Sequence, residues 1–174
     1  MNLEFIELIK SRRSIRKYQD KPVSNEILQK LLEAAQWAPS AHNNQPWEFI
    51  IIKDEEIKRN IANVSSWGKF FSKAPVGIAV VINPLKSNHP IEDGAAATQN
   101  ILLAAHALGL GACWIGSYGS AWEDKAKEIL KIPKELRLLS IVAIGYPAEK
   151  PLSSRKDLKT IVYLDKYGVY ANIF

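Results

Sequence analysis

Apolar residues recur every three or four positions along much of the chain, which is the spacing of amphipathic helices. Leu3, Ile6 and Ile9 predict a first helix that Asn2 can cap, and Ser24 can cap a second. A proline at position 39 ends the second helix, because the residue before a proline disfavours helical geometry. The spacing predicts helices over Leu3–Ile9, Ile27–Ala35, Asp54–Val64, Trp67–Ala74, Ile91–Leu108 and Trp122–Leu130.

Four shorter stretches are almost continuously apolar, as expected of strands in a buried sheet. They are Trp47–Ile52, Val76–Ile82, Ala112–Gly116 and Leu136–Gly145. Helices and strands alternate irregularly, so their order favours an α+β fold or a mixed three-layer sandwich. A doubly wound dinucleotide fold is disfavoured, because the chain has no G-x-G-x-x-G motif.

Two segments carry apolar surface that another part of the molecule, or a second subunit, would have to bury. The stretch Ile91–Leu108 is apolar nearly all round, which indicates burial on more than one side, and a subunit interface suits the second side. Residues 148–174 are a basic extended stretch followed by short aromatic segments that cannot fold alone. We expect them to form an arm that docks on its own subunit or on a partner.

Composition fits one globular domain of 174 residues, with 47% hydrophobic and 24% charged residues. The net charge of +5 suits an anionic small molecule or a weak nucleic-acid patch. A single cysteine, Cys113, excludes an intrachain disulfide and suits a reducing compartment. The sequence shows neither a secretion leader nor an apolar run of membrane-spanning length, so we expect a cytoplasmic protein.

The first candidate for chemistry is the basic stretch Ser11–Tyr18. It gathers Arg12, Arg13, Arg16 and Lys17 beside serine hydroxyls and leaves no apolar stripe. Guanidinium forks and short hydroxyls are the groups that hold a phosphate. A solvated basic turn explains the same residues equally well.

A second basic cluster, Arg155 and Lys156, lies in the expected arm. If the fold brings the two clusters together, they form a phosphate site. The spacing alone favours two separate surface patches.

Acid–base groups are few. His42, His89 and His106 are the only histidines, no G-x-S-x-G motif is present, and no ligands stand at zinc-binding spacing. We expect His106 to be packed within its helix and Cys113 to be a buried, inert thiol. Cations, amides, glycine turns and aromatic residues remain, which suits a protein that holds an anionic, planar cofactor.

Trp67, Phe70, Phe71 and Ala74 stand at i, i+3, i+4 and i+7. This spacing predicts the core face of an amphipathic helix. The alternative is an aromatic wall or lid over a planar ligand.

Four motifs in order resemble the nitroreductase family of FMN-dependent oxidoreductases. They are Arg12–Tyr18 after a short helix, Ala38–Phe49 with its Gln-Pro-Trp, Gln99–Gly116, and Gly145–Glu149 followed by Arg155-Lys156. The resemblance runs from about residue 3 to the tail and points to the compact members of the family. It implies a homodimer of single-domain subunits (1–174), each a three-layer α-β-α sandwich around a mostly antiparallel central sheet. The arm, 148–174, would dock on the dimer partner.

The resemblance also implies a place for the phosphate end of FMN. Arg12, Ser14 and Arg155 would hold the phosphate and ribityl chain, with Arg13 and Lys156 close by.

For the flavin ring, the resemblance places Arg16 at the pyrimidine end, where a cation stabilises the charge that develops on reduction. Asn43 would bond the ring edge. Pro39, Ser40 and Ala41 would pack on the flavin from the second subunit.

Ile115 and Gly116 would offer main-chain N–H groups near flavin N5, with Trp114 shaping that loop. The aromatic segment with Trp67, Phe70 and Phe71 would contact the substrate, and its shortness implies an open or small lid.

By likeness, the reaction is ping-pong: NAD(P)H reduces FMN at N5 and leaves, and a nitroaromatic, quinone or related acceptor follows. The partners would then be small molecules, with neither nucleic acid nor a membrane involved. Two alternatives stay open: a flavin-binding protein without catalysis and a flavin-dependent reductive dehalogenase.

Overall fold

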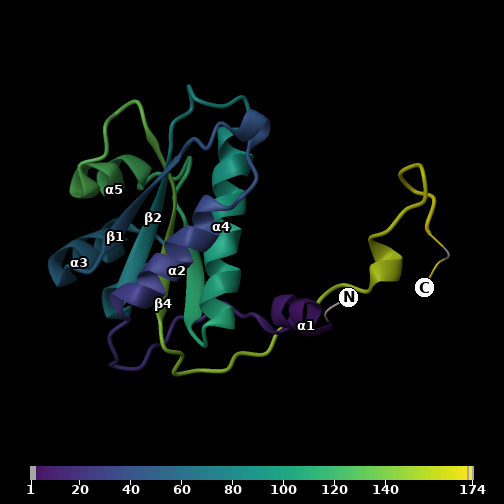
Figure 1. Cartoon of the computed structure of the whole chain (residues 1–174), viewed down its shortest axis with the longest axis horizontal. Helices are drawn as coiled ribbons and strands as arrows, with labels where there is room; N and C mark the ends of the chain where they lie inside the picture. Colours follow the sequence, from purple (N-terminus) through teal and green to yellow (C-terminus); the bar gives the residue numbers. More distant parts are fainter. Residues whose placement is uncertain (1–2, 172, 174) are drawn as a thin grey trace.

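The computed structural model describes residues 3–171 and 173 as one α+β domain with an extended tail (Figure 1). The chain runs through helix α1 (Leu3–Ser11), helix α2 (Asn25–Gln36), strand β1 (Trp47–Ile52), helix α3 (Glu55–Val64), strand β2 (Val76–Ile82), helix α4 (Pro90–Ala107), strand β3 (Gly111–Gly116), helix α5 (Glu123–Leu130) and strand β4 (Arg137–Gly145). Short 3₁₀ turns stand at η1 (Ala41–Asn43), η2 (Lys69–Lys73) and η3 (Leu158–Thr160).

The central sheet has four antiparallel strands in the order β1-β2-β4-β3. Strand β2 is buried along its whole length, and its alternate residues face two separate cores. Ile78 and Val80 pack with α2 and α4, whereas Ala79 and Val81 pack with α3 and α5. The molecule is therefore a three-layer α-β-α sandwich, as Figure 1 shows and as the sequence predicted.

Local sequence signals explain the helix starts. The side chains of Ser24 and Asp54 accept hydrogen bonds from the amides of Ile27 and Ile57, which caps α2 and α3. The predicted cap of α1, Asn2, lies outside the described residues.

Helix α4 is the long apolar helix of the sequence. At Gly94 the helix lies so close to the sheet that a Cβ would stand 2.6 Å from Ile82 and 2.7 Å from Leu139. Asn100 Nδ2 donates to the Ala34 carbonyl at 2.8 Å and joins α4 to α2.

One predicted helix is wrong. The stretch 67–74 forms only the short turn η2, because Gly68 offers no side-chain cap and Pro75 follows closely. Its aromatic residues diverge: Phe71 is fully buried, whereas Trp67 is 89% exposed.

The arm leaves the body beyond Pro147 and extends away from it (Figure 1). It closes on itself through a bridge between Tyr163 and Tyr170, while Leu152 and Tyr167 are almost fully exposed. None of the described helices combines the length and the hydrophobicity that a membrane crossing requires.

Candidate functional site

The basic stretch is held on the end of the sheet by main-chain hydrogen bonds. Ser14 forms a parallel bridge with Ala112, and the Ile15 amide donates to the Ala112 carbonyl at 3.0 Å. The Ile15 side chain is buried against Gly111, where a Cβ would stand 2.7 Å from it. This close approach fixes the register of the stretch and leaves the flanking arginines outside the core.

A second anchor lies a few residues further along. The Tyr18 hydroxyl donates to the carbonyl of Ile15 at 2.5 Å, with the Ala143 carbonyl at 3.3 Å. Burial raises the pKa of Tyr18 well above its usual value, so the phenol stays protonated and keeps this bond. The Gln19 amide donates to Tyr146 O at 2.9 Å. The basic stretch is thus fixed at both ends.

The two basic clusters meet in a cavity of about 220 Å³, called here the phosphate cavity. It is lined by Arg12, Arg13, Ser14, Arg16, Pro151, Leu152, Ser153 and Arg155. Spacing alone favoured two separate patches, whereas the family resemblance implied a shared site; the structure brings the two clusters together, although Lys156 and Lys17 do not line this cavity. Burial lowers the pKa of Arg12, and the charges of Arg155 and Arg13 lower it further.

The arginines of the phosphate cavity differ in what they already bind. Arg13 Nη1 donates to the carbonyls of Lys10 and Arg12 at 2.6 and 2.8 Å, so it caps the end of α1. Arg155 Nη1 donates to Ser153 Oγ at 2.7 Å and Ser154 O at 2.8 Å. All keep free N–H groups, and none of the residues lining the cavity is acidic. The cavity therefore fits a phosphate dianion.

A second cavity of about 310 Å³, called here the ring cavity, lies next along β3. It is lined by Arg16, Ser65, Trp67, Phe70, Cys113, Trp114, Ile115, Gly116 and Trp122. Arg16 lines both cavities, and its guanidinium carbon stands 5.7 Å from the centre of the Phe70 ring. A flat aromatic ligand with a phosphate tail fits this pair of cavities, with Arg16 at their junction.

The structure separates the three aromatic residues that were predicted to meet substrate. Trp67 and Phe70 line the ring cavity, whereas Phe71 does not. Phe71 packs in the core below Gly77, so its predicted substrate contact is corrected here to a packing role. Helical spacing could not show this, because the segment is not an α-helix.

Three residues of the ring cavity, Ser65, Cys113 and Trp122, were not predicted as site residues from the sequence. Ser65 caps the following turn by accepting from the Gly68 amide at 2.9 Å. Trp122 was expected on the core face of a helix; it is buried in the core with α3 and α5, and from just before α5 it also lines the ring cavity. A tryptophan at the start of a helix beside a glycine-rich loop is the one signal that could have indicated a site position.

The predicted ring-contacting loop lies elsewhere in the subunit. Among the residues that the structure describes, Pro39, Ser40, Ala41 and Asn43 line neither cavity. The loop is instead held to the start of α4 by Asp93, which is 5% exposed.

Asp93 accepts from the Ala41 amide at 2.9 Å and from the Ser87 hydroxyl at 2.6 Å. The loop beyond contains three non-glycine residues with positive φ: His42 (51°), Asn43 (56°) and Gln45 (47°). Such left-handed geometry costs energy and persists only where surrounding contacts hold it.

Sequence comparison assigns this arrangement to a family. Residues 9–75 and 64–146 match the model of the nitroreductase family. The chain belongs to this family. The match covers the whole sheet and the segment Arg12–Tyr18.

Individual proteins of the nitroreductase family are similar to this chain in sequence and in structure. A protein from Archaeoglobus fulgidus, provisionally named an NADH dehydrogenase/NAD(P)H nitroreductase, is 40% identical over 84% of this chain and 87% of its own length. The crystal structure of a Parabacteroides distasonis protein with the same provisional name has a TM-score of 0.91 at 32% identity, covering 94% of this chain and 99% of that one.

A third relative adds a bound cofactor. The crystal structure of a provisionally assigned nitroreductase from Desulfovibrio desulfuricans, in complex with FMN, has a TM-score of 0.84 at 34% identity. It covers 96% of this chain and 99% of that chain.

Two titratable side chains near the cavities of this family member, His106 and Cys113, have shifted pKa values. His106 Nε2 lies 2.9 Å from Ser11 Oγ, and burial followed by the charges of Arg12 and Arg13 lowers the pKa of His106. Cys113 is buried, as expected, and burial raises the pKa of its thiol, while the residue also lines the ring cavity. No cluster of metal ligands occurs among the described residues.

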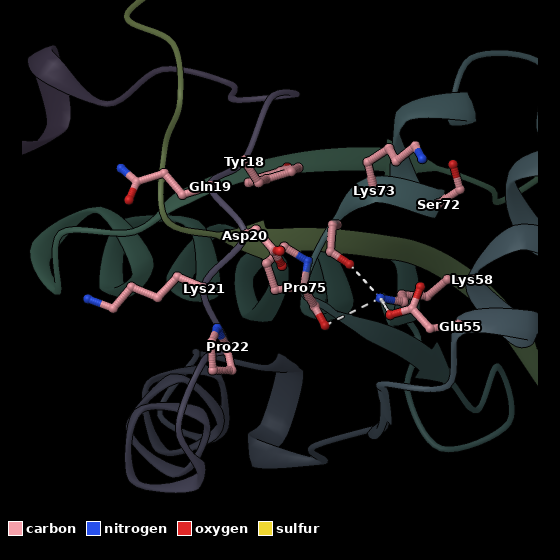
Figure 2. A pocket seen from close by; sticks show the side chains of 11 residues that line it. Tyr18, Gln19, Asp20, Lys21, Pro22, Glu55, Lys58, Ser72, Lys73 and Pro75 are labelled. Carbon is pink, nitrogen blue, oxygen red and sulfur yellow. Dashed lines mark hydrogen bonds and ion pairs between the residues drawn. The ribbon is translucent and has the colours of Figure 1, made fainter.

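A further cavity of about 480 Å³ lies on the other side of Tyr18 (Figure 2). The ammonium of its buried lysine, Lys58, lies among protein oxygen acceptors at Glu55, Ala74 and Pro75. Lys58 Nζ donates to Ala74 O and Glu55 Oε1 at 2.7 Å each, and lies 3.4 Å from Pro75 O. With its donors engaged by protein groups, this lysine ties α3 to the turn before β2.

Proposed function

We propose that this chain is an FMN-dependent NAD(P)H oxidoreductase that reduces nitroaromatic, quinone or related acceptors by a ping-pong mechanism. The observation that carries the proposal is the pair of adjoining cavities with Arg16 at their junction. One has the donors of a phosphate site and the other has aromatic walls. The provisional names of its relatives, which include NAD(P)H nitroreductase, and the FMN complex of another relative support the choice of cofactor and reductant.

The residues present fit FMN. In the phosphate cavity, Arg12, Arg155 and the Ser14 hydroxyl would hold the phosphate, while Arg13 adds positive charge from the end of α1. Arg12 is half-buried, which strengthens its attraction for an anion relative to a fully exposed arginine.

In the ring cavity, Arg16 would stabilise negative charge at the pyrimidine end of the ring. The main chain at Ile115 and Gly116, where β3 ends, would donate near the reacting edge. When bound, FMN supplies the hydride acceptor and donor chemistry that these side chains lack. The chain therefore contributes binding, orientation and charge, which agrees with the small number of acid–base groups in its sequence.

We further propose that the active form is a homodimer. Helix α1 exposes Phe5, Ile6 and Ile9 in a single subunit, and the arm exposes further large apolar residues. The ring-contacting loop at Asn43 lies away from its own subunit's cavities, as expected if it serves the partner's flavin. We place this activity in the cytoplasm, because a chain with one cysteine gains nothing from an oxidising compartment.

Anaerobic spectroscopy tests the proposal. We expect purified protein to be yellow, or to become so with added FMN, and the flavin absorbance to bleach with NAD(P)H and return with a nitroaromatic or quinone. Protein that takes up no FMN contradicts the proposal. A flavin that NAD(P)H cannot reduce indicates a non-catalytic flavin-binding protein, and turnover of halogenated substrates alone indicates a dehalogenase.

The Arg16→Ala variant tests the site itself. It should weaken FMN binding and slow flavin reduction, because it removes the charge common to both cavities. Arg59→Ala is the matched control, since Arg59 is an exposed arginine on α3 that lines neither cavity. Equal behaviour of the two variants would refute the place given to Arg16.

A further inference from the structure

Glu149 binds the main chain of the basic stretch. Its Oε1 atom accepts from the amide of Arg16 at 2.6 Å and from the amide of Lys17 at 3.1 Å. Bonds from amides to a carboxylate are stronger than neutral ones. The Ala148 amide donates back to the Lys17 carbonyl at 2.9 Å, so residues 148 and 149 together clasp the stretch.

Glu149 also marks the point where the arm leaves the body. Among the described residues, no hydrogen bond joins the chain beyond Glu149 to the rest of the molecule. Yet Pro151 to Arg155 form one wall of the phosphate cavity, and Arg12 and Arg16 form the other. Glu149 is therefore the last bonded contact that sets where Arg155 lies.

The two walls repel each other. Arg155 and Arg13 both contribute to the lowered pKa of Arg12, after the larger effect of burial. A carboxylate nearby offsets this repulsion, but one that paired with a guanidinium would compete with the anion. Glu149 avoids this by accepting from amides: within residues 3–171, no ion pair shorter than 4.0 Å involves Glu149 or an arginine of the phosphate cavity.

We propose that Glu149 is the positioning residue of the phosphate cavity. It holds the Arg12–Arg16 wall and the Arg155 wall at the separation that a phosphate group bridges, while leaving their guanidinium groups free. The proposal rests on the proposed function, in that FMN is the ligand whose phosphate enters this cavity.

Riboflavin, which has the flavin ring without the phosphate, separates this role from a general effect on folding. The experiment measures the Kd of FMN and of riboflavin for full-length wild type, Glu149→Ala and Glu149→Gln. We expect Glu149→Ala to weaken FMN binding about 10-fold, the loss of one charge-assisted contact. Riboflavin binding should change less than about threefold, since it makes no use of the cavity.

The glutamine variant isolates the hydrogen bonds from the charge. Its amide oxygen can still accept from Arg16 and Lys17, so FMN affinity should stay within about threefold of wild type. Glu128→Ala removes an exposed carboxylate on α5 and is the control for net charge. If Glu149 acted only as a repulsive charge, both Glu149 variants would bind FMN more tightly, and the proposal would be overturned.

The outcomes distinguish this inference from the proposed function. Wild type that binds neither flavin, or binds riboflavin as tightly as FMN, contradicts the FMN site itself. Wild type that prefers FMN, with Glu149→Ala keeping the same preference, overturns only the role of Glu149. Circular dichroism of each variant verifies that the fold persists, and the FMN-to-riboflavin ratio stays informative if stability falls.

Discussion

The Glu123 carboxylate accepts the hydrogen bonds that hold the loop beside the ring cavity. It is 3% exposed and accepts from Arg137 Nε at 2.7 Å and Arg137 Nη2 at 2.6 Å. It also accepts from the amides of Gly119 at 2.7 Å and Leu138 at 3.2 Å. The loop ends at Trp122, a wall of the ring cavity, so this carboxylate links the stability of the fold to the shape of the site.

Replacement of Glu123 by alanine leaves these donors without an acceptor. Breaking a buried ion pair costs about 3–5 kcal/mol. The Arg137 side chain is 35% exposed and regains water, which reduces the penalty. We therefore expect the free energy of unfolding to fall by about 2–3 kcal/mol, most of it from the Leu138 and Gly119 amides.

The pH dependence of the free energy of unfolding separates the contribution of the Glu123 charge from that of its side-chain packing. Burial alone would raise the pKa of Glu123, but bonds from Arg137, Gly119 and Leu138 and the charge of Arg137 outweigh it, so the pKa is lowered. A carboxyl group with a lower pKa in the folded state stabilises the protein above its unfolded pKa of about 4.3. That contribution is lost as the pH falls through the folded value, so Glu123→Gln should flatten the loss of stability below about pH 4.

Urea denaturation followed by tryptophan fluorescence, between pH 7 and pH 3, makes the measurement. Glu128→Gln is the matched control, because Glu128 is exposed on the same helix. The reasoning is refuted if Glu123→Ala unfolds within about 0.5 kcal/mol of wild type at pH 7, the range of ordinary surface substitutions. It is also refuted if Glu123→Gln and wild type lose stability in parallel below pH 4.

Three further substitutions test the placement of residues near the cavities and in the core. Asp93→Ala removes the acceptor of the Ala41 amide and should lower the free energy of unfolding by about 1–3 kcal/mol and release the left-handed loop. Urea denaturation and proteolysis of the loop measure this, and an unchanged cleavage rate would contradict the anchoring role. Phe71→Ala should cost about 3–5 kcal/mol, because its ring is fully buried, whereas Phe70→Ala should cost little stability and raise the KM for the acceptor. Thermal unfolding and steady-state kinetics compare the pair, and similar stability losses would reverse the assignment.

The elements of the fold were largely readable because their signals are local. Continuous apolar runs gave the four strands, and Ser24 and Asp54 stood where helix caps were needed. The long helix α4 followed from its composition. These features depend on neighbours within one turn or one strand, which the sequence displays directly.

The failures had two sources: local residues that overrode a helical spacing, and contacts between residues far apart in the sequence. The spacing of Phe70 and Phe71 looked helical, but Gly68 and Pro75 allowed only a short turn. The meeting of Arg12 with Arg155 could not be derived from spacing, because it depends on how the chain leaves β4 and crosses the basic stretch. Trp122 and Ser65 entered the ring cavity through loop geometry that no periodicity encodes.

The site residues that the family resemblance implied fall into two groups. Arg12, Ser14, Arg16 and Arg155 share one cavity, so their grouping has structural support. Asn43 and its loop stay a prediction, since their role depends on a second subunit.

The division of the phosphate cavity between two ends of the chain has a consequence for how the protein matures. The last strand of the sheet ends at Gly145, whereas Arg155 comes later, on a segment that, among the described residues, makes no hydrogen bond to the body beyond Glu149. During synthesis the sheet can close before the second wall of the cavity exists, so cofactor loading follows folding. A protease that cuts after Glu149 should therefore leave a folded domain that no longer binds its flavin. Cleavage or displacement of the arm would thus change the cofactor content of the protein without unfolding it.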